Sequence, residues 1–473
     1  NVPRLPGDNA TTIPRDFGFG AAPGTVTLNG ESLAITTWSS SAIEAVIPAG
    51  AMTGQLMVTR NAADGGRTTV TGITVIVDDG TIPLVTQVPL GGSMSIQDAI
   101  DATPPGGVVL IPPGNYREAL IVTKPIQLQG WGADSTIIES QLSPIEKIVA
   151  WREKANYLTN CPGVEYPIAL LHAPNGVGED QTNNAQNPLG PCGFTPGTGL
   201  FLAEEAPGVL VAPRDRVFNG SQSARIDGLT LTGAYNSHGV LVNGYADFLE
   251  ISNNLITGNQ GLEGAGGIRV GIVREQAVEP LSSDSDFVNI HHNNISGNGS
   301  ITQGGAGVGI YRGADNYRVT NNYVCGNFSQ GGGAGITHYG LTNNGLIADN
   351  RVLFNQSFNQ SPGFAANGAG ILIAGQGERV TIEPLPPNEG PTEFTISEGT
   401  GNVKVLRNYI QGNNIGSGDG AGIAIDQANG QDVLASPANP ANWHHVDILN
   451  NIVVNNVAGM AGGGMSLKDA LRV

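Results

Sequence analysis

The chain contains few charged residues, and their signs are unbalanced. Charged side chains make up 13% of its 473 residues, and 40 Asp and Glu against 22 Lys and Arg give a formal net charge of −18 at pH 7. Nucleic acids and anionic membrane surfaces are bound through Lys and Arg, so a surplus of negative charge opposes both. We therefore expect neither nucleic acid nor an anionic membrane surface as a partner.

Long apolar runs are missing as well. A membrane-spanning helix needs about 20 consecutive apolar residues, and no segment approaches that length, so no membrane insertion is expected. Aromatic residues make up only 5% of the chain, whereas there are 69 glycines, as is typical of a turn-rich, secreted all-β protein. Because the chain opens on Asn1 rather than Met and shows no signal peptide, we expect it to be processed or cut from a longer product. Its composition leads us to expect a protein that is secreted or displayed on the cell surface, in an extracellular or periplasmic location.

Cysteines are scarce. Cys161 and Cys192 share one irregular stretch, and Cys325 stands alone within a repeat. We expect a Cys161–Cys192 disulfide formed in an oxidising compartment, with three reduced thiols as the alternative. Three cysteines without CxxC spacing do not make a structural zinc site, so no metal is expected. No other cofactor is expected, and calcium is left open without a motif that supports it.

One pattern recurs six times and indicates the architecture. It reads apolar-x-apolar-x-x-Asn-x-apolar, usually followed by x-Gly-Asn, with its asparagine at Asn254, Asn293, Asn322, Asn350, Asn408 and Asn451. Alternating apolar residues indicate a strand with one buried face. A buried Asn is costly unless its amide is paired, and identical Asn side chains stacked above one another pair in a ladder. The pattern therefore predicts a solenoid of parallel strands with an internal Asn ladder, one coil per repeat.

A second motif, Gly-Ala-Gly-Ile or a variant of it, gives the length of a coil. It precedes Ile268, Val308, Ile336, Ile371, Ile423 and Met465, and Val240 fills the same place. The shortest spacings, 14 residues from Asn322 to Ile336 and 14 from Ile336 to Asn350, add to a coil of 28 residues. Longer coils gain their extra residues after this anchor strand, near 271–287, 374–402 and 426–444. Each coil is thus predicted to hold three strands, with the insertions beside the anchor strand.

The start of the solenoid carries a resemblance to a known family. The segment SMSIQDAIDAT at 93–103 predicts a short amphipathic helix with Ser95 as its N-cap, followed by GGVVLIPPGNYRE and LIVTKPIQLQGWG. Together with the repeats, it resembles the right-handed parallel β-helix proteins of the pectin-lyase-like superfamily over about 93–140 and 220–473. The resemblance implies an all-β, three-sheet β-helix over 93–473, closed by a capping helix at 93–103 and interrupted by a long insertion at 141–219. It also implies a substrate groove along the first sheet.

Residues 1–78 form a separate predicted domain. The runs Gly18-Phe19-Gly20, TVTLNG at 25–30, Trp38-Ser39 and VIPAG at 46–50 resemble an IPT/TIG domain, a small immunoglobulin-like β-sandwich. This resemblance implies a spacer or binding module rather than a catalyst. Residues 79–92 are expected to be a linker.

Alternation along the anchor strands predicts which side chains line the groove. The expected substrate-binding residues are Arg269, Tyr311, Arg312, Tyr339, Asp426 and Lys468. Neighbouring coils stack ~4.8 Å apart, so Tyr311 and Tyr339 should lie side by side, and aromatic rings flanked by arginines can form a platform for sugars. The alternative is surface stacking that only stabilises the sheet.

The case for catalysis is weaker than the case for binding. Glycoside hydrolysis needs two carboxylates roughly 5–10 Å apart, and the predicted face carries only Asp426, with Asp419 in the preceding turn. His338 falls on an inward position, where a core histidine with satisfied hydrogen bonds is expected, although a bulge would make it a candidate base. Asp426 and His338 are therefore the weak catalytic candidates.

Two adjacent histidine pairs raise the question of a metal site. They are His291-His292 and His444-His445, and adjacent residues on a strand point to opposite faces, which is poor chelating geometry.

We expect the protein to be a non-catalytic β-helix scaffold that binds a polysaccharide or cell-surface glycan. The alternative is a polysaccharide lyase, epimerase or glycoside hydrolase acting along the first-sheet groove. The next ladder asparagine is due at about residue 479, beyond Val473, so further coils or domains of the same polypeptide are expected after this chain.

Overall fold

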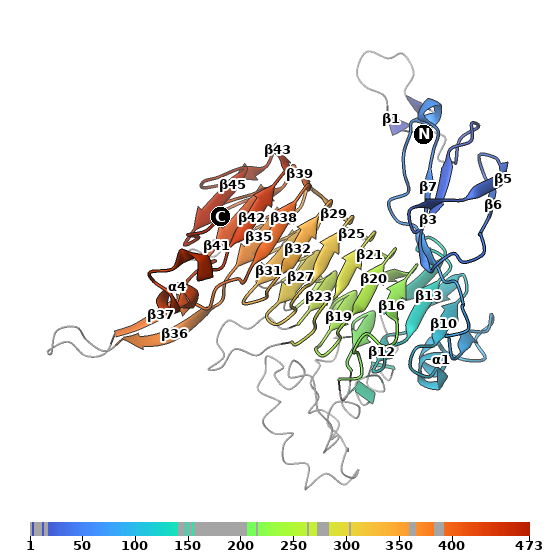
Figure 1. Ribbon diagram of the computed structural model, residues 1–473, viewed down its shortest axis with the longest axis horizontal. Coiled ribbons are helices and arrows are strands. Elements are labelled where there is room, and N and C mark those ends of the chain that lie inside the picture. The colour runs from blue at the N-terminus through green and yellow to red at the C-terminus, as the bar shows by residue number, and fades with distance from the viewer. Residues whose placement is uncertain are drawn as a thin grey trace, which may run out of the picture. The chain divides into compact units, whose positions relative to one another are not determined.

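The computed structural model divides the chain into two compact units, Asn1–Thr81 and Ile82–Val473 (Figure 1). The structure describes residues 2–3, 12–13, 18–140, 147–148, 151, 154–155, 206–213, 216–262, 264–271, 283–301, 304–358, 366–382 and 392–473. Among these residues, no helix has both the length and the apolar character needed to cross a membrane.

The N-terminal unit is an antiparallel β structure. Its sheet has the order β4-β3-β7-β8, with β3 (Thr25–Leu28), β4 (Glu31–Ser32), β7 (Gly54–Thr59) and β8 (Ile73–Val75). Two further strand pairs are β5 (Ala34–Trp38) with β6 (Ile43–Val46), and β1 (Val2–Pro3) with β2 (Thr12–Ile13); η1 (Ala62–Asp64) is a short 3₁₀ turn. Val26, Leu28 and Leu33 form a small core with Trp38 packed against it. Membership of the IPT/TIG family stays a prediction.

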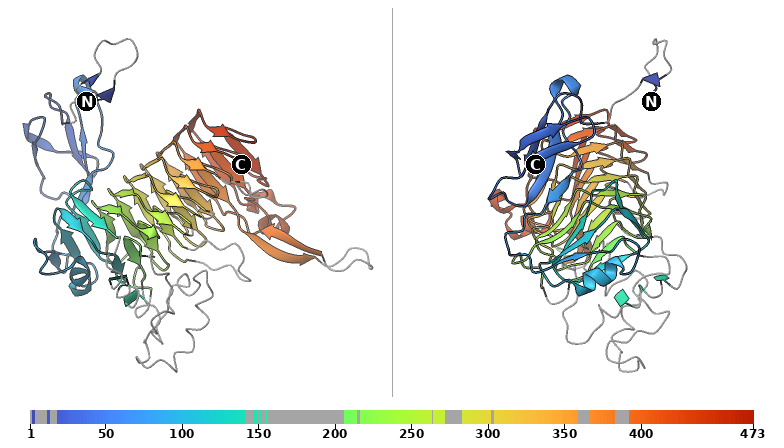
Figure 2. Two further views of the ribbon diagram at one scale, coloured as in Figure 1. Left: turned by 180° about the vertical axis from the view of Figure 1, so that it is seen from behind. Right: turned by 90° about the vertical axis from the view of Figure 1, so that its right-hand side faces the viewer.

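The second unit is a right-handed parallel β-helix, as predicted. Figure 2 shows its strands stacked coil upon coil. Sheet 1, the anchor sheet, contains β12 (Leu120–Val122), β15 (Val209–Val211), β19 (Val240–Val242), β23 (Ile268–Val270), β27 (Val308–Tyr311), β31 (Ile336–Tyr339), β35 (Ile371–Ala374), β41 (Ile423–Asp426) and β45 (Met465–Lys468).

Two more long sheets complete the expected three. Sheet 2 contains β9 (Val85–Gln87), β10 (Val108–Ile111), β13 (Gln127–Gly130), β16 (Ala224–Asp227), β20 (Leu249–Ser252), β24 (Asn289–His291), β28 (Arg318–Thr320), β32 (Gly345–Ala348), β38 (Val403–Leu406) and β42 (Val446–Leu449). Sheet 3 contains β11 (Gly114–Tyr116), β14 (Thr136–Glu139), β17 (Thr230–Thr232), β21 (Leu255–Thr257), β25 (Asn294–Ser296), β29 (Tyr323–Cys325), β33 (Arg351–Leu353), β39 (Tyr409–Gln411) and β43 (Ile452–Val454).

A fourth parallel sheet was not expected. Sheet 4 consists of two-residue strands, namely β18 (Tyr235–Asn236), β22 (Gln260–Gly261), β26 (Gly299–Ser300), β30 (Phe328–Ser329), β34 (Gln356–Ser357), β40 (Asn414–Ile415) and β44 (Val457–Ala458). These strands are too short to show an alternating apolar pattern, so no period in the sequence predicts them.

The asparagine ladder is confirmed. In each step the side-chain Nδ2 donates to Oδ1 of the asparagine one coil further along, at 3.0–3.1 Å, through Asn254, Asn293, Asn322, Asn350, Asn408 and Asn451. The same Nδ2 atoms also donate to backbone carbonyls inside the coil, as Asn322 does to Ile290 O at 2.9 Å. From Asn254 to Asn451, each coil turn between sheets 2 and 3 is therefore tied to the next by side-chain amides, which are buried except at Asn451.

A second ladder runs beside the first. It uses the asparagine of the x-Gly-Asn extension, and its Nδ2-to-Oδ1 bonds measure 2.9–3.0 Å through Asn259, Asn298, Asn327, Asn355, Asn413 and Asn456. The repeat pattern does not by itself assign these residues to the core, yet Asn298 and Asn327 are buried. A recurring asparagine five residues after the first was the signal available to find them.

The capping helix is confirmed as α1 (Ile96–Ala102). Ser95 Oγ accepts from Asp98 N at 3.0 Å, and the Asp98 carboxylate accepts from Ser95 N at 3.1 Å, which completes a capping box. Ile96 and Ile100 are buried in the main core and close the first coil. β9 lies inside the predicted linker 79–92 and pairs in parallel with β10, so the solenoid begins earlier than the repeat pattern indicated.

The insertion is shorter than the predicted 141–219. β15 lies within that range and pairs with β12 on one side and β19 on the other, so the coil resumes at Val209. This three-residue strand lacks the Gly-Ala-Gly anchor, which is why it was missed. Cys161 and Cys192 lie outside the described residues, and Cys325 is a half-buried free cysteine.

Two later insertions carry structure of their own. The antiparallel pair β36 (Gly377–Ile382) and β37 (Thr392–Ser397) follows β35 in sequence. α4 (Gln431–Ala435) and the 3₁₀ turn η4 (Pro440–Asn442) follow β41. Both insertions leave the coil after sheet 1, where the sequence predicted them.

Candidate functional site

The outer face of sheet 1 is covered at its first coils. Trp151 and Ala155, from the insertion after β14, pack in one apolar cluster with Ile121 of β12, Leu210 of β15 and Leu241 of β19. This part of the predicted groove is therefore filled by the protein's own side chains.

Arg269 and Tyr311 lie on the outer face as predicted, but neither is open to solvent. Tyr311 is fully buried, its ring lies against Gly309, and its hydroxyl donates to the carbonyl of Gly304. Arg269 bends back to donate from Nε to Gly271 O at 2.9 Å, with its guanidinium 5.9 Å from the Tyr311 ring centroid. Tyr311 pairs in register with Tyr339, as expected from the coil spacing. The expectation that Tyr311 presents an open ring is wrong. Alternation predicts on which side of the sheet a side chain lies, but not which other residues cover that side chain.

His338 is a core histidine, as the inward position predicted. It is fully buried, with Nδ1 2.9 Å from Tyr317 Oη and Nε2 2.9 Å from Thr400 O. Because a carbonyl can only accept, Nε2 carries the proton and Nδ1 accepts from the tyrosine. Burial lowers the pKa of His338 to about 4, so the ring is neutral at pH 7. The strand shows no register shift there, and His338 faces the core rather than the groove.

The open part of the predicted face lies toward the C-terminal coils. Leu372, Ala374 and Ala424 form a small apolar cluster on the outer face, and the half-buried Tyr339 packs against it. These four residues come from β31, β35 and β41, which pair in register. We call them the apolar floor. Leu372, Ala374 and Ala424 are themselves buried, so the half-buried Tyr339 is the member of the floor that is partly open to solvent.

A salt bridge borders the floor on the N-terminal side. Arg312 Nε lies 3.1 Å from Glu398 Oε2, and the other carboxylate oxygen accepts from Leu341 N at 3.0 Å. Glu398 is nearly buried, so this pair is held more firmly than a surface ion pair. Glu398 belongs to the insertion after β35, and nothing in the repeat pattern indicated that it would reach Arg312.

Asp426 and Lys468 border the other side. Lys468 Nζ lies 3.8 Å from Asp426 Oδ1, and Asn367 Nδ2 donates to Oδ2 at 3.2 Å. Burial raises the pKa of Asp426. This effect outweighs those of Lys468 and Asn367, which lower the pKa. The carboxylate therefore keeps a proton to higher pH than a solvated aspartate.

The arrangement is suited to holding a polar polymer with an apolar side. It offers one partly exposed aromatic ring, supported by three buried aliphatic side chains, and a charged pair at each edge. Its two carboxylates are each engaged, Glu398 by Arg312 and Asp426 by Lys468 and Asn367. Within the described ranges, no group of three or more His, Cys, Asp or Glu residues converges as a metal site.

Comparisons with known proteins give low similarity. No family model and no curated protein matches the chain. A pectin methylesterase from Erwinia chrysanthemi is 12% identical with a TM-score of 0.35, the match covering 82% of this chain and 93% of that one. A PL6 family polysaccharide lyase from Pseudopedobacter saltans is 14% identical with a TM-score of 0.23, covering 82% and 86%. The A-module of a mannuronan C-5 epimerase from Azotobacter vinelandii is 14% identical with a TM-score of 0.22, covering 80% and 94%. These similarities are too low to support an argument about function, which therefore depends on this chain's own residues.

Proposed function

We propose that the protein is a secreted or cell-surface β-helix scaffold that binds a polysaccharide across the apolar floor. One observation carries the proposal: the half-buried Tyr339 ring packs on Leu372, Ala374 and Ala424 between two charged pairs.

The chemistry of sugars fits such a surface. A pyranose ring has one face of C–H groups, which are weakly positive and pack well on the negative face of an aromatic ring. Its hydroxyls need donors and acceptors at the edges, which Arg312, Lys468 and the carboxylates beside them supply. Several sugars along a polymer would extend the contact over neighbouring coils.

The charge of the molecule selects among polymers. The chain carries a formal net charge of −18, which repels polyanions over distances set by the ionic strength. Each cation at the floor is matched by a carboxylate, so the site itself adds no positive surplus. We therefore expect neutral polysaccharides to bind more strongly than uronic-acid polymers.

An enzyme acting on a polysaccharide is the second candidate. The raised pKa of Asp426 favours it, since a general acid must hold its proton near the working pH. Hydrolysis needs a second carboxylate. Asp419, which acts electrostatically on Asp426, accepts from Ala461 N, and Glu398 is tied to Arg312 and Leu341 N. This second candidate is weaker than binding because both of these carboxylates already have partners.

A glycan array combined with a product assay tests the proposal. The full chain is applied to neutral and acidic polysaccharides, and the same polymers are incubated with it and assayed for new reducing ends and unsaturated products. We expect saturable binding to at least one neutral polymer without turnover. Turnover would favour the enzyme, and the absence of binding to every polymer would contradict the proposal.

A further inference from the structure

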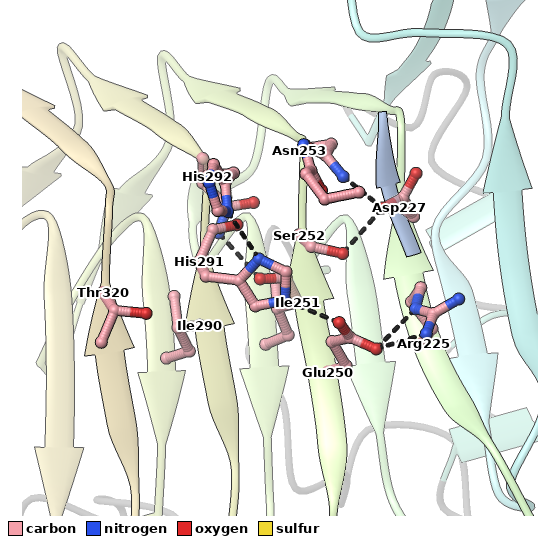
Figure 3. Close-up of polar contacts among 12 residues, drawn as sticks. Arg225, Asp227, Glu250, Ile251, Ser252, Asn253, Ile290, His291, His292 and Thr320 are labelled. Carbon is pink, nitrogen blue, oxygen red and sulfur yellow. Dashed lines mark hydrogen bonds and ion pairs between the residues drawn. The ribbon is translucent and has the colours of Figure 1, made fainter. Parts of the chain in front are cut away.

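A histidine pair on the outer face of sheet 2 has converging rings. His291 ends β24, and His292 follows it in the tight turn before Asn293. Their Nδ1 atoms lie 2.9 Å apart, with the ring planes at 89° (Figure 3). The sequence predicts that the two rings point to opposite faces of the strand. Their convergence therefore requires a backbone conformation other than that of a strand.

The turn explains why the pair converges. His292 has φ = 54°, in the left-handed region, which breaks the alternation of the strand. The residue before the ladder asparagine takes the same conformation in other coils, at Asn253, Asn321, Asp349, Arg407 and Asn450. Left-handed backbone at this position is thus a property of the turn, and histidine occupies it in one coil.

His291 is already oriented by a carboxylate. Its Nε2 lies 2.6 Å from Glu250 Oε1, and Glu250 Oε2 lies 2.6 Å from Arg225 Nη2. A carboxylate can only accept, so Nε2 carries the proton and donates it. The Nδ1 lone pair then points toward His292. Histidines that bind metals usually have this arrangement, with the second ring nitrogen donating to a carboxylate.

The local charge also favours a cation. Asp227 lies one coil from Glu250 on the same outer face, and its carboxylate accepts from Ser252 Oγ and Asn253 Nδ2, both at 2.7 Å. Glu250, which pairs with Arg225, and the buried Asp227 bring two carboxylates into this cluster (Figure 3).

We propose that His291 and His292 bind one divalent transition-metal ion through their Nδ1 atoms, with water in its other positions. Two metal–nitrogen bonds of ~2.0–2.1 Å that span 2.9 Å enclose an angle of about 90°. That angle suits the tetragonal geometry of Cu²⁺ or Ni²⁺ better than the tetrahedral geometry of Zn²⁺. The described residues supply no third His, Cys, Asp or Glu ligand. The cation takes the place of the proton that the two Nδ1 atoms otherwise share.

The repeat itself supplies conservative test variants. Asn occupies the position of His292 in neighbouring coils, at Asn253 and Asn321, so His292→Asn should keep the turn. Thr320 pairs in register with His291, so His291→Thr should keep the strand. The adjacent pair His444 and His445 provides a matched control in His444→Asn/His445→Asn, since these rings instead lie near Asp432 and Asp447.

Calorimetric titration of the full chain with Cu²⁺ and Ni²⁺, combined with electron paramagnetic resonance of the Cu²⁺ form, tests the proposal. We expect one binding site, and a Cu²⁺ spectrum with superhyperfine structure from two nitrogen ligands. Both should be lost in each single variant and retained in the His444/His445 control. Glu250→Gln should weaken the affinity about 10- to 100-fold. An unchanged stoichiometry and spectrum in His292→Asn, with circular dichroism showing a folded protein, would overturn the proposal and leave the pair as a hydrogen bond only.

Discussion

At the scale of single residues, the structure depends on buried amides that satisfy one another. Asn322 donates from Nδ2 to Ile290 O and to Asn350 Oδ1, and its Oδ1 accepts from the backbone N and the Nδ2 of Asn293. No apolar residue can replace it, since the partner amides and carbonyls would remain buried without hydrogen bonds.

We predict that Asn322→Ala lowers the free energy of unfolding by about 3–5 kcal/mol, because several buried polar groups lose their partners and a cavity is left. Urea denaturation followed by circular dichroism measures it. Asn321→Gly is the control, since this exposed neighbour has φ = 57°, which glycine adopts without strain. A loss below 1 kcal/mol for Asn322→Ala would mean that the ladder contributes little to stability.

His338 should make stability depend on pH. Its folded pKa of about 4 lies below the ordinary value of 6.5, so the unfolded chain binds the proton more tightly. Stability is therefore complete above pH 6.5 and falls as the pH drops from 6.5 toward 4, by up to about 3 kcal/mol. Comparing urea midpoints at pH 7.5 and pH 4.5 measures this, and His338→Gln should reduce the difference. Equal pH dependence in the variant would contradict the prediction.

The sequence predicted residue positions better than residue environments. The ladder asparagines, the inward His338 and the outward Tyr311 were placed correctly, because a two-residue period specifies the face of a strand. That Tyr311 is covered was not predictable, because its cover comes from the turn at Gly304 rather than from its own strand. Glu398 was missed for a similar reason, since an insertion brings it to Arg312.

At the scale of elements, the turns between coils decide which side chains fit. Gly258, Gly297, Gly326 and Gly412 occupy one position after the sheet 3 strands, with φ between 64° and 69°, and Phe354 holds the same position with φ = 53°. A Cβ on Gly412 would lie 2.5 Å from Phe354 Cδ1, so the phenyl ring rests on the glycine of the next coil. The Phe354 side chain is thus accommodated only because its neighbour is glycine.

We predict different costs for two matched glycine substitutions. Gly326→Ala should cost about 1–2 kcal/mol, the price of left-handed backbone alone, since nothing lies within 4 Å of the added carbon. Gly412→Ala should cost about 1–3 kcal/mol more, because the Phe354 ring must move. In the Phe354→Ala background this excess should vanish in a double-mutant cycle of unfolding free energies. Equal costs for both glycines in the wild-type background would refute the contact.

Element boundaries were the least predictable feature. β9 and β15 are three-residue strands without the repeat motif, and they were assigned to a linker and an insertion. Short apolar segments such as Val209–Val211 carry no period of their own, so only their pairing with β12 and β19 identifies them. α1 was predictable because a capping box and an apolar stripe both mark it.

At the scale of the whole molecule, the β-helix turns one repeat into a continuous surface. Equivalent residues of successive coils stand in register, so a single outward column becomes a row of side chains along sheet 1. Part of this row is covered by Trp151 and Ala155, and part is left half-open at Tyr339 and Asp426. The proposed polysaccharide site is the open part.

The most direct test of the account is the affinity of the full chain for the best polymer found on the array, compared among variants. Tyr339→Ala should weaken binding at least 10-fold, because it removes the only aromatic ring of the apolar floor. Tyr409→Ala, which removes a more exposed tyrosine on sheet 3, should leave the affinity unchanged. Equal affinities of wild type and Tyr339→Ala would contradict the assignment of the binding surface to sheet 1.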